Sequence, residues 1–516
     1  MKKINPAKED YQRLRGLTCD QLWTQEVPAF DGGDSRERMA RVGVLRAVGV
    51  VFSEFGTMAQ KEMARQWLRG LLRDPEEKVR RYAMTALPKI GASEQDESAL
   101  LALIKTPATE REKTSLSRTL EKIGGTASLA AVQDLAPASL QKIVANVARL
   151  EDPGTVDLKR NFAEFSGVRI HLQCRRGLEG ILKEEAGSVF QREGKFCILE
   201  CRPGVVVVEA RKAFCLGDIF ILRCFHTLSF FLAAGLRSPG QESSLPAAVA
   251  GVIASPMARR ILEAFTEGPI RYRLEFASKG HQRAAVREVA ERVHALCPIF
   301  LNDPRNALWQ INVLPDGGGV EMTPRLRPDP RFSYRRRDVP AASHPPLAAS
   351  MARLAVPAVN DTIWDPFCGS GLELIECALL GGVRKIIGSD RSAEATAIAR
   401  ENFFSACSRR SAPSDLRDAS FHTADFRATE AIIGRGGISL LITNPPMGRR
   451  VPIPDLPGLV ADLFQVAADG LAPGGRLVFA NPCPETPVPR SLQRVYGQKI
   501  DLGGFDVQLE KYLKTG

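Results

Sequence analysis

The stretch TIWDPFCGSGLELIECALL, residues 362–380, is the best guide to how the second half of the chain folds. Its apolar start predicts a strand over 362–364, and the apolar residues of 372–380 recur at helical spacing. The intervening loop has glycines that let the backbone turn and approach a ligand closely. It lacks the Gly-Lys-Ser/Thr of a phosphate loop and the third glycine of a dinucleotide fingerprint. We therefore expect a ligand-binding loop at the carboxyl end of a buried strand.

Predicted strands and helices alternate from about residue 347 onward. The expected strands are Thr362–Trp364, Lys385–Gly388, Leu440–Thr443 and Arg476–Ala480, followed by a β-hairpin around Gly503-Gly504. This alternation predicts a Rossmann-like α/β domain with a parallel sheet, in which ligands bind at the carboxyl ends of the strands.

Acidic residues follow two further strands in this part of the chain. Asp390 stands 19 residues beyond Gly371, where a carboxylate accepts hydrogen bonds from both hydroxyls of a ribose. Asp425 precedes Phe426, and a carboxylate beside an aromatic ring suits the amino group and face of an adenine. Taken alone, each is an ordinary loop aspartate, but their order along successive strand ends favours one shared binding site.

The stretch SLLITNPPMGRRVP, residues 439–452, carries a buried strand into a rigid corner. Neither proline of Asn444-Pro445-Pro446-Met447 has an N–H, and each ring fixes φ, so the corner is stiff. A strand-terminating turn is one interpretation. The other is a clamp in which the Asn444 amide binds a planar amine, and the residues upstream favour the clamp.

Together, Asp365-Pro-Phe-Cys-Gly-Ser-Gly371 and Asn444-Pro-Pro-Met447 resemble class I S-adenosylmethionine-dependent methyltransferases that act on exocyclic amines. The first motif is similar to a narrower group, the THUMP-domain methyltransferases that make N2-methylguanine in RNA. CRRGLEGILKEE (174–185) resembles the start of their ferredoxin-like subdomain, and RFSYRRRDVPAASHPPLAASMARLA (331–355) resembles their linker and following helix. The resemblance covers residues 166–516.

The resemblance implies S-adenosyl-L-methionine as cofactor and assigns a role to each motif. Asp365, Gly369 and Gly371 would hold its methionine part, Asp390 its ribose, and Asp425 with Phe426 its adenine. The expected cofactor site also includes Phe367, Cys368, Ser370, Arg391 and Asn444.

The same resemblance implies how the amine is held. Asn444 and the carbonyl of Pro445, held by Pro446, would accept its two hydrogens and turn the lone pair toward the methyl group. Met447 occupies a position where the family usually has a Tyr or Phe that stacks on a flipped base.

Three alternatives remain open beside guanine-N2 methylation of tRNA. Asn-Pro-Pro serves adenine N6 as well as guanine N2, so an N6-adenine methyltransferase on RNA or DNA is one. Guanine-N2 methylation of ribosomal RNA is the second. A catalytically weak scaffold that binds S-adenosylmethionine and RNA is the third, and Met447 favours it.

The chain is expected to contain several domains, because 516 residues exceed a single core. Leu87-Pro-Lys-Ile-Gly91 recurs 33 residues later as Leu120-Glu-Lys-Ile-Gly124, and Asp74-Pro75 recurs near that spacing as Thr106-Pro107. Repeats of this length indicate helix pairs that resemble HEAT repeats, with an irregular helical bundle as the alternative. We expect a HEAT-like region over 1–152, a ferredoxin-like plus THUMP domain over 166–324, an extended linker over 325–346 and the methyltransferase domain over 347–516.

Charge and composition indicate a nucleic-acid partner in the cytoplasm. The net charge is +11 and the pI about 9.2, which favours a polyanion such as RNA. The eleven cysteines show no metal-ligand spacing, so no metal is expected, and free thiols indicate a reducing compartment. The most apolar run, 213–235, contains Asp218, Arg223 and His226, so no membrane span is expected. The helical repeats could supply a protein contact or a further RNA contact. Expected RNA-binding residues are Lys279, Arg283, Arg287, Arg335, Arg336, Arg337, Arg449 and Arg450.

Overall fold

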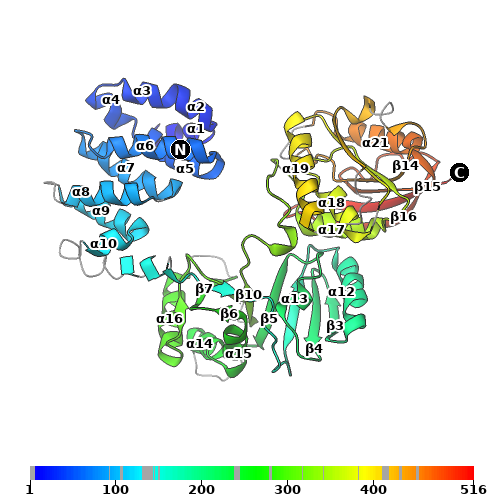
Figure 1. The fold of residues 1–516 in the computed structure, drawn as a ribbon, viewed down its shortest axis with the longest axis horizontal. Helices are drawn as coiled ribbons and strands as arrows, with labels where there is room; N and C mark the ends of the chain where they lie inside the picture. The colour runs from blue at the N-terminus through cyan, green and yellow to red at the C-terminus, as the bar shows by residue number, and fades with distance from the viewer. Residues whose placement is uncertain are drawn as a thin grey trace, which may run out of the picture. The chain divides into compact units, whose positions relative to one another are not determined.

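The computed structural model describes residues 6–91, 93–104, 109–130, 143–144, 146–148, 151–236, 244–277, 282–315, 318–340, 342–381, 383–409, 418–428, 433–448 and 453–515. The chain forms two compact units, Met1–Pro153 and Gly154–Gly516 (Figure 1).

The described residues of the first unit form helices and turns around one apolar core. Its elements are α1 (Pro6–Arg15), α2 (Cys19–Gln21), the π-helix η1 (Leu22–Glu26), α3 (Val27–Asp31), α4 (Ser35–Ala40), α5 (Gly43–Phe55), α6 (Met58–Leu71), α7 (Glu77–Ile90), α8 (Glu94–Ile104), α9 (Glu110–Ile123) and α10 (Thr126–Ala130). Both ends of α9 are displaced by 33 residues from those of α7, as the sequence repeat predicts. Thr106-Pro107 lies outside the described residues.

One sheet of eight strands lies in the N-terminal part of the second unit, in the order β3-β4-β2-β5-β10-β9-β7-β8. Its strands are β2 (Arg169–Gln173), β3 (Phe196–Arg202), β4 (Val205–Ala210), β5 (Thr227–Ala234), β7 (Ile270–Phe276), β8 (Phe300–Asn302), β9 (Trp309–Val313) and β10 (Gly319–Pro324). β10 joins the strands β3, β4, β2 and β5 to the strands β9, β7 and β8, because it pairs antiparallel with β5 on one side and with β9 on the other.

The remaining elements of this region are helices and a small two-stranded sheet. The helices are α12 (Glu179–Glu193), α13 (Leu216–Ile219), α14 (Leu245–Ile253), α15 (Pro256–Phe265) and α16 (Arg283–Leu296), and the small sheet pairs β1 (Thr155–Val156) with β6 (Thr266–Glu267). In the described part of the chain no single helix is long and apolar enough to cross a membrane. Only α14 and α15 taken together, bent by 49°, have the length and composition.

The C-terminal part of the second unit forms a third region. It contains a seven-stranded sheet in the order β13-β12-β11-β14-β15-β17-β16, whose first five strands are parallel. The strands are β11 (Thr362–Asp365), β12 (Lys385–Asp390), β13 (Ala419–Thr423), β14 (Ile438–Thr443), β15 (Leu471–Asn481), β16 (Leu492–Asp501) and β17 (Asp506–Lys514). β17 lies between β15 and β16 and runs antiparallel to both.

Helices cover both faces of this sheet: α17 (Pro345–Ala355), α18 (Leu372–Leu380), α19 (Ala393–Arg409) and α21 (Leu456–Gly470) (Figure 1). Alternating strand residues face two separate cores. Leu440 and Ile442 of β14 pack with α17, α18 and α19, while Leu441 packs with α21. This two-faced burial is what a doubly wound sheet requires, and it explains the continuous apolar run of β14.

The expectation of an extended linker over 325–346 is wrong in its middle part. Residues Pro330–Phe332 form a short 3-10 helix, η4, and Phe332 and Tyr334 are buried. The aromatic rings bring this segment into the core, because removing their large apolar area from water stabilises the fold. The Tyr334 hydroxyl donates to Glu376 Oε1 of α18 at 2.5 Å, so the linker is fixed to the helix that follows the glycine loop.

Two buried carboxylates connect the region of the eight-stranded sheet to the third region. Arg223 donates from Nε and Nη2 to the two oxygens of Glu376 at 2.6 and 2.7 Å. Arg353 of α17 donates from Nε to Glu185 Oε1 of α12 at 2.9 Å. The two-point, charge-assisted bond between Arg223 and Glu376 holds both partners in one orientation.

Candidate functional site

The loop after β11 contains a glycine at a position where a side chain would strain the backbone. Gly371 has φ +84°, and a Cβ there would lie 3.2 Å from Cα of Ala399. Gly369 also has a positive φ, +49°. The loop therefore turns directly into α18, as the sequence predicts.

Asp365 is fully buried at the end of β11 and is only partly satisfied. Its Oδ1 accepts from Thr443 Oγ1 at 2.6 Å and from the Phe367 N–H at 3.0 Å. Its Oδ2 is buried and has no hydrogen-bond partner among the described residues. Burial, together with the nearby Glu373 carboxylate, raises the pKa of Asp365 well above its usual value. A buried oxygen without a partner is costly, so this atom is suited to a cationic donor from a ligand.

Asn444 presents the same feature at the end of β14. Its Nδ2 donates to Ser343 Oγ at 2.8 Å, while its Oδ1 is buried without a partner among the described residues. Ser343 in turn donates to Glu373 Oε1 at 2.5 Å. The amide is thus held by its nitrogen end, and its oxygen is left for a donor that the described residues do not supply.

The two acidic residues predicted for ribose and adenine lie at neighbouring strand ends, β12 and β13. Asp390 accepts from the Gly369 N–H at 3.1 Å and from the Ser392 N–H at 2.9 Å, which fixes its carboxylate beside the glycine loop. Asp425 accepts from the Arg427 N–H at 2.9 Å, and its Oδ2 lies 3.7 Å from Nε of Arg391. Each carboxylate is oriented by backbone N–H groups and keeps further lone pairs for a ligand.

The expectation that the Phe426 ring offers a face to the adenine is not met by its burial. Its ring is 2% exposed and belongs to the core beneath α21, with the Phe367 ring centroid 4.8 Å away. Phe367 is half-buried and presents the more accessible ring. Met447 is half-buried against the opposite core. The Phe426 ring is therefore part of the support for the loop rather than an open face.

Cys368 and Ser370 have side chains that point into the protein. Both are buried, and burial raises the pKa of the Cys368 thiol well above its usual value. The backbone of the loop is held by neighbours, because Cys368 N–H donates to Ser389 O at 2.9 Å and Ser370 O accepts from Asn402 Nδ2 at 3.1 Å. Any contact of these two residues with a ligand would use main-chain atoms.

The arginines predicted to bind RNA are mostly engaged within the chain. Arg335 pairs with Asp338, Arg336 Nε donates to Ser405 Oγ at 3.0 Å, and Arg337 lies 3.5 Å from Glu394. On α16, Arg287 pairs with Glu291 at 2.8 Å and Arg283 is exposed at the start of the helix. Lys279, Arg449 and Arg450 lie outside the described residues.

A cavity of about 310 Å³ lies at the start of α17, and sequence reasoning did not find it. It is lined by His226, Pro328, Asp329, Arg331, Phe332, Arg335, His344, Pro345 and Pro346. Burial and the neighbouring Arg175 lower the pKa of His344 to about 4, so this histidine is neutral at pH 7. The one sequence signal for this cavity is the Arg-rich linker, because the two histidines that line the cavity come from segments far apart in the chain.

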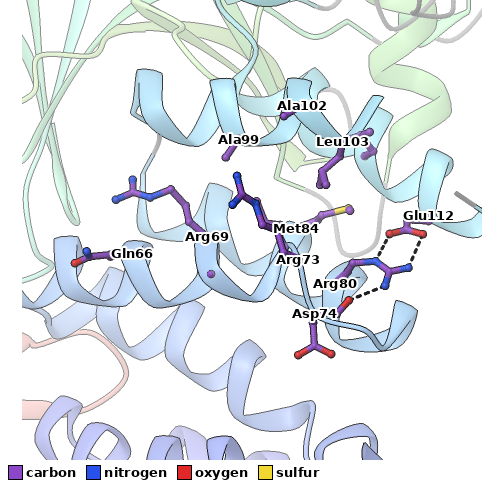
Figure 2. Close-up of a pocket in the computed structure, with 13 residues that line it drawn as sticks. Gln66, Arg69, Arg73, Asp74, Arg80, Met84, Ala99, Ala102, Leu103 and Glu112 are labelled. Atoms are coloured by element: carbon purple, nitrogen blue, oxygen red, sulfur yellow. Dashed lines mark hydrogen bonds and ion pairs between the residues drawn. The ribbon is translucent and has the colours of Figure 1, made fainter. Parts of the chain in front are cut away.

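A second cavity, of about 840 Å³, lies between helices of the first unit (Figure 2). Arg80 is joined there to Glu112 at 2.5 and 3.0 Å, and Arg69 donates to Asp96 at 2.8 Å. The arginines that line this groove are therefore largely neutralised by carboxylates of the same unit. Among the described residues, no cluster of three or more His, Cys, Asp or Glu side chains could hold a metal ion.

The chain is similar to known methyltransferases in part of its length. Residues 333–488 match the family model for the RMKL-like methyltransferase domain. The chain is 27% identical over 190 residues to tRNA (guanine(10)-N2)-dimethyltransferase of Methanothermobacter thermautotrophicus, a match that covers 36% of this chain and about half (49%) of that protein. It also resembles the crystal structure of TrmN from Thermus thermophilus, with a TM-score of 0.51 and 24% identity over 67% of this chain and 99% of that one.

The family match coincides with the part of the chain that contains the glycine loop, the acidic strand ends and the Asn-Pro-Pro corner. The parallel sheet with helices on both faces has the same fold as the solved relative. Residues 333–488 therefore match a methyltransferase domain, and the cofactor is S-adenosyl-L-methionine.

Proposed function

We propose that the protein is an RNA methyltransferase that methylates the exocyclic N2 amine of a guanosine in tRNA. The observation that carries the proposal is the buried Asn444 Oδ1, which has no partner among the described residues although Nδ2 of the same amide is fixed. The similarity to a relative named as a tRNA guanine-N2 enzyme and the net charge of +11 support RNA as the substrate.

The residues of the loop and strand ends fit the cofactor. Asp365 Oδ2 is a buried acceptor without a partner in the described chain, suited to the ammonium of the methionine part. Gly369 and Gly371 carry no Cβ that would cover the loop backbone, and Asp390 and Asp425 supply oriented acceptors for ribose and adenine. When bound, S-adenosyl-L-methionine supplies a methyl group on a sulfonium, so that forming the N–C bond breaks an S–C bond, leaves S-adenosylhomocysteine and releases one proton.

The chain's own part in the reaction is orientation. The lone pair of guanine N2 is delocalised into the ring, which makes the amine a poor nucleophile. Asn444 Oδ1 and the Pro445 carbonyl accept its two hydrogens, which favours a pyramidal nitrogen with a directed lone pair. Acceptors fixed in a buried site need no reorganisation as charge develops. The proton leaves to water after transfer, when its acidity has risen, so no strong base is required.

The pKa of Asp365 predicts a pH dependence of ligand binding. In the free protein the pKa of this carboxyl is raised, and an ammonium at Oδ2 favours the charged form and lowers it. Binding therefore releases a proton below the raised pKa, and the affinity for S-adenosylhomocysteine increases with pH by up to about tenfold per unit there, becoming flat above it. Calorimetry in buffers of different ionisation enthalpy measures both quantities.

The control for this prediction is Asp365→Asn, which keeps the shape of the side chain without a titrating group. It is expected to bind more weakly and to lose the dependence on pH in that range. An equal pH dependence in both proteins would assign the proton to another group near the loop.

We further propose that the eight-stranded sheet region contains a THUMP domain that recognises RNA by shape and phosphate contacts, and that the first unit is HEAT-like. The displacement of 33 residues between α7 and α9 supports the repeat. The exposed Arg283 on α16 is available for a phosphate. The helical unit would then offer a surface to a protein partner or to a further part of the RNA.

The test is nucleoside mass spectrometry of bulk tRNA after incubation with the protein and S-adenosylmethionine, with Asn444→Ala as the matched inactive variant. N2-methylguanosine, formed by the wild type alone, is the expected product. N6-methyladenosine would replace the guanine assignment, and a product in ribosomal RNA only would replace the tRNA assignment. Absence of transfer to any RNA would favour a binding scaffold.

A further inference from the structure

The bonds around Asn444 continue beyond the amide into two residues outside the recognised motifs. Ser343 lies 101 residues earlier, in the segment before α17, and its Oγ accepts from Asn444 Nδ2 at 2.8 Å. The same hydroxyl donates to Glu373 Oε1, on the first turn of α18, at 2.5 Å. Resting on the proposed function, we propose that Ser343 and Glu373 are positioning residues that hold the Asn444 amide with its oxygen toward the substrate amine.

The need for such a device follows from the shape of an amide. Its oxygen and its nitrogen are nearly equal in size, so packing alone does not distinguish the two orientations. Only one of them serves the proposed reaction, because an NH₂ group directed at the amine would present hydrogens to hydrogens. The orientation must therefore be set by hydrogen bonds on the other side of the amide.

The direction of those bonds is set by the carboxylate. The Ser343 hydroxyl donates to Glu373 Oε1, so its proton is directed to that carboxyl group. The lone pairs of that hydroxyl are then left facing Asn444, where only Nδ2 can donate. A reversed amide would bring two acceptors together at 2.8 Å.

The surroundings of Glu373 make this arrangement hard to replace by water. The residue is 3% exposed. Burial raises the pKa of Glu373, and the bond from Ser343 opposes that effect by favouring the charged form. The hydroxyl therefore helps to stabilise the buried carboxylate, and the carboxylate in turn fixes the orientation of the hydroxyl.

The first measurement is steady-state methyl transfer to bulk tRNA, with S-adenosylhomocysteine affinity measured by calorimetry. Ser343→Ala is expected to lower kcat by roughly 10- to 100-fold, while that affinity stays within about twofold. Ser343→Thr keeps the hydroxyl and is expected to recover most of the rate. Ser188→Ala, which removes a hydroxyl whose one bond among the described residues is to the Glu185 carbonyl of its own helix, is the matched control and leaves kcat unchanged.

The second measurement does not depend on activity. Selective ¹⁵N labelling of asparagine allows the side-chain NH₂ of Asn444 to be observed by NMR and assigned by its loss in Asn444→Ala. In Ser343→Ala and Glu373→Gln these signals are expected to shift and to exchange faster with water, and in Ser343→Thr to stay near their wild-type positions.

The two measurements separate the two proposals. If the wild type transfers no methyl group to any RNA, the proposed function fails, and the NMR signals still decide the positioning role. Unchanged Asn444 signals in both Ser343→Ala and Glu373→Gln would overturn it. So would a wild-type kcat in Ser343→Ala.

Discussion

Asn444→Ala is expected to lower kcat for methyl transfer to tRNA by about 10²- to 10³-fold while leaving S-adenosylhomocysteine binding nearly intact. Removal of one fixed acceptor at a reacting centre typically has this effect. The variant loses the buried Oδ1, and it also leaves Ser343 without its donor. Transfer of an isotopically labelled methyl group, together with calorimetry, measures both quantities.

Asn444→Asp is the isosteric partner of this variant. It keeps an oxygen at the position of Oδ1 but replaces the donor to Ser343 with a second acceptor and adds charge near Asp365 and Glu373. It is therefore expected to be as inactive as Asn444→Ala. If either variant retained more than a tenth of the wild-type kcat, the Asn444 amide would not be the amine clamp.

Gly177→Ala is expected to destabilise the second unit by about 3 kcal/mol and to lower its Tm by roughly 5 °C. Gly177 has φ +95°, and a Cβ there would overlap the backbone carbonyl oxygen of Lys499 on β16. The neighbouring residues bond the end of the same strand, since Asp501 N–H donates to Arg176 O at 3.1 Å. The loop before α12 must move away, which separates the region of the eight-stranded sheet from the edge strand of the seven-stranded sheet.

Gly180→Ala provides the matched control three residues away. A Cβ at Gly180 meets nothing within 4 Å, and the residue lies in the first turn of α12. Alanine there is expected to be neutral or to stabilise by less than about 1 kcal/mol. Thermal unfolding followed by circular dichroism compares the two, and equal melting temperatures would show that the Gly177 contact is not essential to the unit.

Regular periodicity made much of the third region predictable. The helix over 372–380 is observed at those residues, and the strand expected at Leu440–Thr443 is extended by two residues at its start. The glycine loop was predictable because a tight turn from strand to helix at a ligand demands that residue type. Each of these features is determined by residues within one short segment of the sequence.

The non-local features of the site had no such signal. Ser343 lies in a segment rich in small residues and proline, and nothing near it in sequence indicates a bond to an amide 101 residues later. Phe426 looked like an exposed stacking ring because its neighbour Asp425 is polar, whereas its burial depends on the packing of α21. The continuous sheet through β5 and β10 likewise depends on pairing between distant strands.

The position of β17 also bears on how the protein is made. Strand β15 acquires its second neighbour only when residues 506–514 have been synthesised, because β17 inserts between β15 and the earlier strand β16. During translation the parallel strands β11 to β15 are complete while β15 still has an unpaired edge, and β16 has no partner at all. A ribosome stalled before residue 506 would therefore expose an open strand edge of the kind that associates with other chains.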